Sequence, residues 1–290
     1  MSTSFIEERR AVYAGFGTRE LAVAGNGPTI LLVHGFGDAA DAWRLVLDLL
    51  QHAGQAAVAV DLPGFGQADP LDDGALLPQL DAFLAEVIRH YGRAQGVVVV
   101  GNSLGAAGAV RAARNNGLPI AAVMTLGVAG VRWKPLTASI NVIAAVLRVV
   151  ATVPVPIPGR AHQIVLRRAL SPLLYGERSA VDPRVVASIA GGIADVKTTH
   201  RLVQLGAMFK AELDQTHVYG GIDVPMTVVH GARDRLVPVS ASRVLHEANP
   251  GSRLVVLRRA GHCPQLDAAD VVAHHARELA VNYTAHKEIS

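Results

Sequence analysis

Several residue types are scarce in this chain, and each scarcity excludes a class of protein. Cys263 is the only cysteine among 290 residues, which excludes a disulfide framework and a metal site built from cysteines. Aromatic residues make up 4% of the chain, so the core must be built largely from Ala, Val and Leu. Charged residues make up only 18%, against 50% hydrophobic residues, a balance that disordered chains lack. The sequence therefore predicts a globular protein with a buried aliphatic core.

Long runs of basic or of apolar residues are also missing. The net charge is only +3 and Lys and Arg are spread along the chain, whereas nucleic-acid binders concentrate basic charge on one face. The first ten residues include Glu7, Glu8, Arg9 and Arg10 and contain no apolar segment, so we expect no secretory signal. The most apolar stretch, 136–158, carries Arg148 near its middle, and its uncharged parts are too short to span a bilayer. We expect a soluble, cytoplasmic protein with no nucleic-acid partner and no transmembrane segment.

Short apolar runs alternate with helical patterns along most of the chain. The runs are nearly continuous in apolar residues, which is typical of parallel strands covered on both faces. They lie at 29–33, 56–60, 97–100, 120–124, 226–229 and 253–257. Helices are expected at 42–52, 74–91, 104–116, 240–248 and 267–283, and an antiparallel edge hairpin at 11–24. This alternation predicts an α/β fold with a mostly parallel sheet flanked by helices.

The alternation stops between Val128 and Thr216. Helical patterns there follow one another at 137–151, 160–170, 182–195 and 198–214, with prolines at 154, 156 and 158. We expect residues 1–127 and 217–290 to form the core domain and residues 128–216 to form a helical cap over a site. The cap is rich in apolar residues, which either line a pocket, with Ile143 and Leu147 as candidates, or pack on one another and on the core. An apolar cap could also contact lipid weakly or join two chains, so a monomer and a homodimer both remain open.

Ser103 is the candidate nucleophile. It lies at the centre of Gly101-Asn102-Ser103-Leu104-Gly105, between an apolar run and an Ala-rich helical pattern. The two glycines allow a sharp turn from strand to helix, which holds the serine hydroxyl out at the carboxyl end of the sheet. The alternative interpretation of the same pattern is a helix cap without chemistry.

A nucleophilic serine needs a general base, and the base needs an acid to orient it. Asp234 follows the run at 226–229, and His262 follows the run at 253–257 on a Gly-containing loop. The chain order Ser103, Asp234, His262 suits a catalytic triad in this type of fold. Asp223 is the rival acid, but it precedes its strand and so belongs at the opposite end of the sheet.

An oxyanion site completes the predicted machinery. His34-Gly35-Phe36-Gly37 follows the run at 29–33, so the backbone amides of Phe36 and Leu104 are the candidate donors. We expect His34 to brace this loop, because no cluster of further ligands accompanies it, and we expect no metal or cofactor. Asn102 and Cys263 adjoin the nucleophile and the base, and are candidates for the pocket wall; Cys263 could also pack under its loop.

These segments, with Asp61-Leu62-Pro63-Gly64-Phe65-Gly66, resemble the α/β-hydrolase superfamily over nearly the whole chain. The resemblance implies the α/β-hydrolase fold, an esterase-like or lipase-like serine hydrolase, a structural role for the 61–66 loop and a helical cap. Relatives that open epoxides or remove halogens carry Asp where this chain has Ser103, so the resemblance implies neither activity. Carbon–carbon hydrolases often share the Gly-Asn-Ser start of the nucleophile turn, but they tend to carry Trp at the position of Cys263.

The leading hypothesis is hydrolysis of a carboxylic ester of a largely apolar small molecule through an acyl-enzyme intermediate. Thioester or carbon–carbon cleavage by the same residues is the first alternative. The second is a ligand sensor with an intact triad and little turnover.

Overall fold

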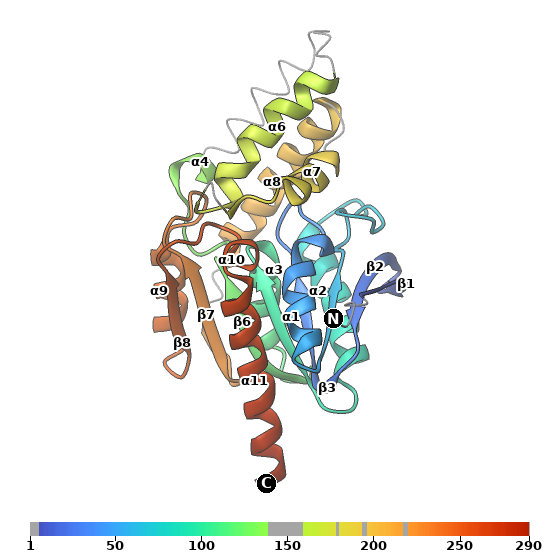
Figure 1. Ribbon diagram of the computed structural model, residues 1–290, viewed down its shortest axis with the longest axis vertical. Helices are drawn as coiled ribbons and strands as arrows, with labels where there is room; N and C mark the ends of the chain where they lie inside the picture. The colour runs from blue at the N-terminus through green and yellow to red at the C-terminus, as the bar shows by residue number, and fades with distance from the viewer. Residues whose placement is uncertain (1–5, 139–158, 178–179, 193–195, 217–219, 290) are drawn as a thin grey trace.

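A central eight-stranded sheet organises the protein, whose computed structural model describes residues 6–138, 159–177, 180–192, 196–216 and 220–289 (Figure 1). Its spatial order is β1-β2-β4-β3-β5-β6-β7-β8. All pairs from β4 to β8 are parallel, whereas β1 and β2 are antiparallel to their neighbours. The predicted mostly parallel α/β fold is therefore confirmed. The strands are β1 (Glu7–Tyr13), β2 (Phe16–Val23), β3 (Asn26–Val33), β4 (Gln55–Val60), β5 (Val97–Asn102), β6 (Ile120–Leu126), β7 (Met226–Gly231) and β8 (Arg253–Leu257).

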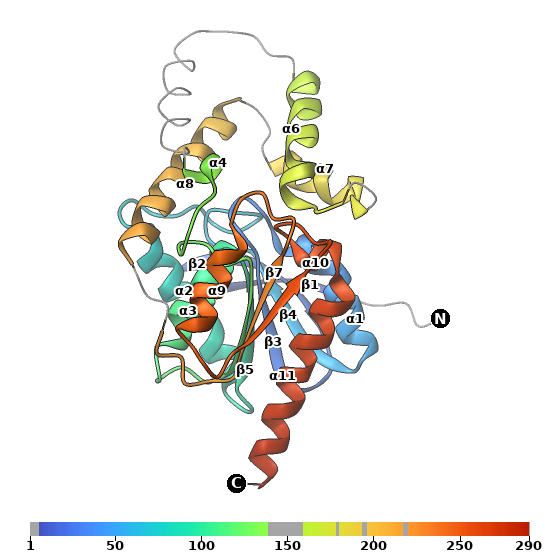
Figure 2. The ribbon, with the colours of Figure 1, turned by 90° about the vertical axis from the view of Figure 1, so that its left-hand side faces the viewer.

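Helices cover both faces of this sheet, as the view in Figure 2 shows. One face packs against α1 and α11 through a core that includes Trp43, Leu47 and Val272. The other packs against α2, α3 and α9 through a core that includes Phe83 and Leu245. The helices are η1 (Ala40–Trp43), α1 (Arg44–His52), α2 (Leu76–Gly92), α3 (Leu104–Ala113), α9 (Val239–Glu247), α10 (Pro264–Asp267) and α11 (Ala269–Ile289).

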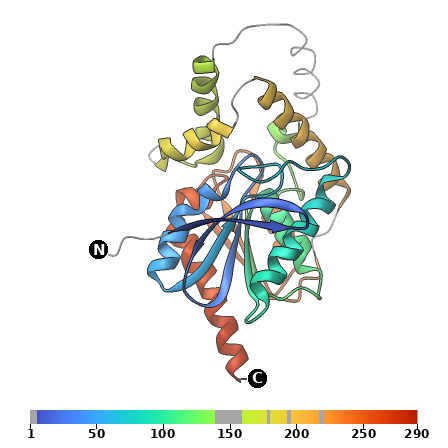
Figure 3. The same cartoon turned by 90° about the vertical axis from the view of Figure 1, so that its right-hand side faces the viewer.

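The edge hairpin is longer than predicted. The sequence pattern suggested 11–24, but β1 already begins at Glu7 and pairs along its length with β2. Residues 7–10 are charged and exposed, so they give no apolar alternation from which a strand could be recognised. Ala14 and Gly15 both have positive φ (50° and 85°), the conformation of a tight hairpin turn. Figure 3 shows the hairpin lying across the edge of the sheet.

The helices that the structure describes between β6 and β7, which we call the cap helices, lie above the carboxyl ends of the strands (Figures 1 and 2). They are α4 (Pro135–Ala138), α6 (Gly159–Leu174), α7 (Pro183–Gly192) and α8 (Val196–Gln215). The helices predicted at 160–170, 182–195 and 198–214 are thus present. Most of the one predicted at 137–151, with Ile143 and Leu147, lies outside the described residues. None of the described helices is both long and apolar enough to cross a membrane.

Candidate active site

Ser103 occupies a strained turn between β5 and α3. Its backbone has φ 54° and ψ −109°, a conformation that costs a non-glycine residue on the order of 1–3 kcal/mol. The backbone is held there by hydrogen bonds, since the Ser103 amide donates to the Leu126 carbonyl at 2.9 Å and its carbonyl accepts from the Ala107 amide at 3.0 Å. The hydroxyl makes no capping bond to α3 and the residue is half-exposed. The side chain is therefore presented outward, which disfavours the interpretation as a simple helix cap.

The two flanking glycines are required by close backbone contacts. A Cβ on Gly101 would lie 2.2 Å from the Gly105 carbonyl oxygen, and one on Gly105 would lie 2.4 Å from the Val33 carbonyl oxygen. Atoms at such distances overlap, so only glycine fits at either position. The glycines are thus required for close packing, because they let β5, β3 and α3 meet at one point; neither has the positive φ that a sharp turn at a glycine would show.

Asp234 and His262 are brought together from two neighbouring loops. Asp234 follows β7 and His262 follows β8, and the His262 Nδ1 lies 2.7 Å from the Asp234 Oδ2. Both side chains are buried. Because a carboxylate only accepts, Nδ1 carries the proton and Nε2 is left as the basic nitrogen. The rival Asp223 is exposed and precedes β7, which places it at the opposite end of that strand.

His262, helped by a backbone amide, keeps the Asp234 carboxyl ionised. Burial by itself would raise its pKa, but the charge and hydrogen bond of His262 and the Val237 amide outweigh burial, so the pKa lies below its usual value. The Oδ1 accepts from the Leu236 and Val237 amides at 2.7 and 2.9 Å. A carboxylate in this state both orients an imidazole and stabilises its protonated form.

Gly127, at the end of β6, lies directly against this pair and was not singled out from the sequence. Its φ is +55°, and a Cβ there would lie 3.2 Å from the Asp234 Oδ2 and 3.5 Å from the His262 Nδ1. A side chain would therefore press on the bond between acid and base. A glycine directly after an apolar run was the available signal, but the chain has many such glycines.

Asn102 does not line the substrate pocket, although this was expected from the sequence, because its contacts lie inside the protein. Its side chain is buried, and its amide nitrogen donates to the carbonyls of Leu126 and His262 at 3.1 and 2.9 Å. Its Oδ1 accepts a hydrogen bond from the side-chain nitrogen (Nε2) of Gln265 at 3.2 Å. Asn102 thus joins the nucleophile turn to the loop of the base, behind the site.

Cys263 packs under its loop, which was the second of the two expectations for it. It is 2% exposed and contacts an apolar cluster that includes Tyr175, Val186 and Leu266. Burial raises the pKa of its thiol well above the usual value, so it is protonated and a poor nucleophile.

The loop after β3 carries Phe36, one of the two candidate oxyanion donors; the other, Leu104, is the first residue of α3. A Cβ on Gly35 would lie 3.2 Å from the Ser103 Cβ, so this loop lies directly against the nucleophile turn. Among the described residues, neither the Phe36 amide nor the Leu104 amide has a backbone partner outside its own element. Two free amides beside a serine suit an oxyanion hole.

His34 braces this loop, as predicted. Its Nδ1 donates to the Gly35 carbonyl at 2.7 Å, and its Nε2 accepts from the Leu62 amide at 2.9 Å. Complete burial lowers its pKa, so the ring is neutral and can fill both roles. The imidazole therefore ties the candidate oxyanion loop to the 61–66 loop.

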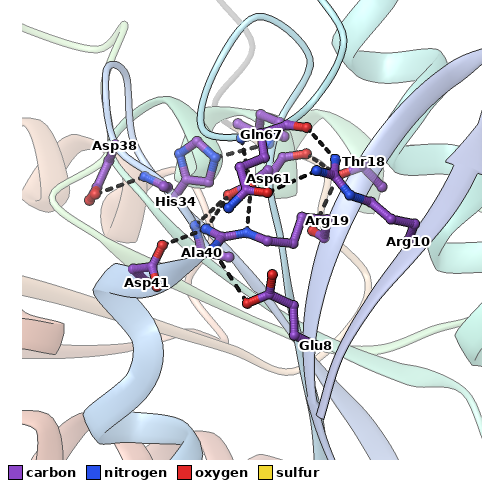
Figure 4. Close-up of polar contacts among 12 residues, drawn as sticks. Glu8, Arg10, Thr18, Arg19, His34, Asp38, Ala40, Asp41, Asp61 and Gln67 are labelled. Carbon is purple, nitrogen blue, oxygen red and sulfur yellow. Dashed lines mark hydrogen bonds and ion pairs between the residues drawn. The ribbon is translucent and has the colours of Figure 1, made fainter. Parts of the chain in front are cut away.

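A buried ion pair supports both loops from below (Figure 4). The Asp61 carboxylate accepts from Arg19 Nε and from the Gln67 amide, both at 2.9 Å, and from the Ala40 amide at 2.7 Å. Arg19 also pairs with Asp41. Asp61 is fully buried, and the structural role implied for the 61–66 loop is explained by these contacts. Arg19 was not predicted, because a charged residue in an edge hairpin is expected to face solvent.

The end of α6 is fastened to the loop of the general base. The Asp267 Oδ2 accepts from the Gly176 amide of the cap at 2.9 Å and from the Gly261 amide at 2.6 Å. The Cys263 amide donates to the Leu174 carbonyl at 3.0 Å. One cap helix therefore helps to hold the backbone on both sides of His262.

Two clefts lie between the core loops and the cap helices. The larger one, of about 570 Å³, which we call the polar cleft, has charged side chains such as Arg19, Asp41 and Arg201 among apolar ones; the smaller one, of about 190 Å³, is almost entirely apolar. They share Gly37, Asp38, Ile189 and Leu202. Phe36 lines the apolar cleft, so both clefts adjoin the candidate oxyanion loop.

One group of potential metal ligands occurs among the described residues, on α11. It comprises His274, His275 and Glu278, whose donor atoms lie within 4.8 Å of one another. Glu278 already pairs with Arg253 and His275, both at 3.1 Å. The group follows the end of α10 and is separate from the Asp234–His262 pair.

Comparisons with known proteins agree with this architecture. An uncharacterized protein of Mycobacterium tuberculosis is 28% identical over 273 residues, which covers 85% of this chain and 73% of that protein. The 2-hydroxy-6-oxononadienedioate/2-hydroxy-6-oxononatrienedioate hydrolase of Cupriavidus pinatubonensis is 25% identical over 254 residues, covering 83% and 82%. The crystal structure of a bacterial membrane phospholipase A has a TM-score of 0.77 at 20% identity, covering 96% and 87%. A profile of the Alpha/beta hydrolase family matches residues 30–275, more than half of the chain, and the protein belongs to that family.

Proposed function

We propose that the protein is a serine hydrolase that cleaves a carboxylic ester of a largely apolar small molecule. The observations that carry the proposal are the buried 2.7 Å bond between His262 and Asp234 and the strained, outward-facing turn of Ser103, whose neighbour Asn102 bonds to the His262 carbonyl at 2.9 Å. A histidine oriented by a carboxylate is the usual activator of a serine nucleophile. Membership of a family of hydrolases supports the same reaction class.

In the proposed reaction the Ser103 Oγ attacks the ester carbonyl carbon while His262 Nε2 accepts its proton. Asp234 holds Nδ1–H and stabilises the imidazolium. The Phe36 and Leu104 amides donate to the oxyanion, which typically contributes on the order of 3 kcal/mol for each donor. His262 then gives the proton to the departing alcohol. Water, deprotonated by the same nitrogen, releases the acyl group and restores Ser103.

The apolar cleft is the proposed site for the hydrocarbon part of the substrate. Its walls are mainly aliphatic and aromatic, with Phe36, Leu174 and Val203 among them. A concave apolar surface beside a few convergent polar groups is the usual form of a small-molecule site. We assign residues 128–216 to a cap that provides most of these walls, and residues 1–127 and 217–290 to the core.

Carbon–carbon hydrolysis is the second candidate, and thioester hydrolysis the third, both on the same residues. The Cupriavidus relative, whose name states a 2-hydroxy-6-oxo acid hydrolase, favours the former. Cys263, in the position where such enzymes tend to carry Trp, weighs against it. The cytoplasmic location, the weak lipid contact and the monomeric or dimeric state stay predictions.

Labelling and turnover test the proposal. A fluorophosphonate should modify Ser103, and labelling should vanish in Ser103→Ala but persist in the control Ser171→Ala on α6. A panel of p-nitrophenyl esters, acyl-CoAs and vinylogous diketones then identifies the reaction class. Turnover near ten per second on an ester supports the proposal, whereas turnover well below one per second on every compound favours a ligand sensor. Labelling that survives Ser103→Ala would contradict the assigned nucleophile.

A further inference from the structure

Asp38 stands at the junction of the two clefts, two residues after the proposed oxyanion donor Phe36. It lines both the polar and the apolar cleft. The backbone around it is fixed, since the Asp38 amide donates to the Gly35 carbonyl at 3.3 Å. A ligand that extends from one cleft into the other must therefore pass this side chain.

Only one of the two carboxyl oxygens of Asp38 forms a hydrogen bond within the described residues. Its Oδ1 accepts from the Ala39 amide at 2.8 Å, but its Oδ2 is buried and has no hydrogen-bond partner among the described residues. The residue is 7% exposed. A buried polar atom without a partner destabilises a fold, so native proteins rarely keep one unless it serves a function.

Comparison with its neighbours shows that this open oxygen is a local exception. Asp38, Asp41 and Asp61 lie at one corner of the molecule, where Glu8 also pairs with Arg19 (Figure 4). Asp61 is saturated by Arg19 and two backbone amides, and Asp41 is paired with both Arg19 and Arg44. Asp38 lies apart from Arg19 and bonds only to its own loop.

The surroundings of Asp38 also decide what kind of partner suits it. Burial raises its pKa to about 7; the charges of Asp41 and Asp61 add to this, while the Ala39 amide and His262 oppose it. A carboxyl group that is about half protonated at neutral pH has, in its protonated form, an O–H to donate. The matching ligand atom is therefore an acceptor oxygen.

We propose that Asp38 is a substrate-binding residue, whose open carboxyl oxygen forms a hydrogen bond with a hydroxyl or carbonyl oxygen of the substrate next to the scissile ester. The substrate class is then an oxygenated ester, with its hydrocarbon part in the apolar cleft and its second oxygen function at the polar cleft. This inference rests on the proposed ester hydrolysis for the identity of the ligand.

Matched ester pairs test the inference on either side of the scissile bond. The acyl side is tested with p-nitrophenyl 3-hydroxybutyrate against p-nitrophenyl butyrate, and the alcohol side with glycerol monobutyrate against propyl butyrate. A site built to bond a hydroxyl discriminates strongly against the analogue that lacks it. We expect a preference of about tenfold or more in kcat/KM for the hydroxylated member of one pair.

Variants of Asp38 assign that preference to its carboxyl group. Asp38→Leu, which has a similar size but no polar atom, should bring the ratio within each pair to about one. Asp38→Asn should keep part of the preference, because its amide can still donate. The control Asp73→Asn, on an exposed loop, should leave the ratio as in the original protein. A ratio that Asp38→Leu leaves unchanged, or the absence of any preference in both pairs, overturns the inference.

Binding separates this inference from the proposed reaction. The same pairs are titrated calorimetrically into Ser103→Ala, with and without Asp38→Leu, after thermal melts have shown that each variant folds. Tighter binding of the hydroxylated ester that is lost with Asp38→Leu supports the inference even if the original protein hydrolyses no ester, in which case only the proposed function fails. Equal binding of both members overturns the inference even if hydrolysis is rapid.

Discussion

The two sides of the candidate site use their polar groups differently. On the side of β7 and β8, both carboxylate oxygens of Asp234 are committed to protein partners. On the side of β3, the Phe36 amide and the Asp38 Oδ2 have no such partner in the described part of the chain. The base side is thus preorganised by the chain itself, whereas the oxyanion side keeps its donors available for a ligand.

Removing the group that lies between the two sides should have the largest effect. Ser103→Ala should fold normally yet lose on the order of 10⁵-fold in kcat, because triad members act as a unit. Steady-state hydrolysis of the best ester in the panel measures the loss. A variant that keeps more than a few per cent of the activity would show that the nucleophile lies elsewhere.

Replacing Asp234, the acid on the base side, by a neutral residue should cause the second largest loss of kcat. Asp234→Asn should lower kcat on the order of 10³–10⁴-fold with the fold intact, since the imidazole then loses its fixed tautomer and its counter-charge. Asp223→Asn is the matched control and should be nearly silent, because Asp223 is exposed and precedes β7. The reverse pattern would mean that the acid has been assigned to the wrong residue.

Ionisation of Asp38, on the oxyanion side, should make the free energy of unfolding depend on pH. Because burial raises the pKa of Asp38 from 3.8 to about 7, the folded state binds more protons than the unfolded state between those values. The free energy of unfolding should therefore fall as pH rises through this window, by up to about 4 kcal/mol from this group. Urea unfolding of Asp38→Asn should show a flatter pH profile, and Asp73→Asn should keep the original slope. Equal slopes in both variants would contradict the assignment.

A smaller effect is expected where the cap fastens the base side. Asp267→Asn weakens the bonds to the Gly176 and Gly261 amides and should lower kcat by about 10- to 100-fold through misplacement of His262. The exposed Asp270→Asn on α11 is the control. A change in KM alone, with kcat intact, would indicate that the contact shapes the pocket and leaves the base undisturbed.

Cys263→Ser should have the smallest effect on catalysis. The thiol is buried, protonated and packed among apolar side chains, so the exchange should lower the melting temperature slightly and keep most of the activity. A loss comparable to that of Ser103→Ala would show that the base side depends on this sulfur far more than its contact in the site, 3.6 Å to the Asn102 Oδ1, indicates.

The sequence predicted the features that depend on local pattern. The core strands were visible as continuous β-branched runs, and Ser103, Asp234 and His262 were visible because each follows such a run at a glycine. The sequence did not predict the features that depend on contacts between residues far apart in the chain. Arg19 is buried against Asp61, 42 residues away, and Asp41. Asn102 faces inward toward the carbonyl of His262, which lies 2.9 Å from its side-chain nitrogen.

The strained turn at Ser103 has a consequence that a thermal melt can measure. Alanine keeps a Cβ in the same unfavourable backbone conformation, whereas glycine adopts positive φ without that penalty. Ser103→Gly should therefore melt at a higher temperature than Ser103→Ala, although glycine ordinarily destabilises a position relative to alanine. The difference between the two melts measures how much stability the protein forgoes to keep a reactive side chain on this turn.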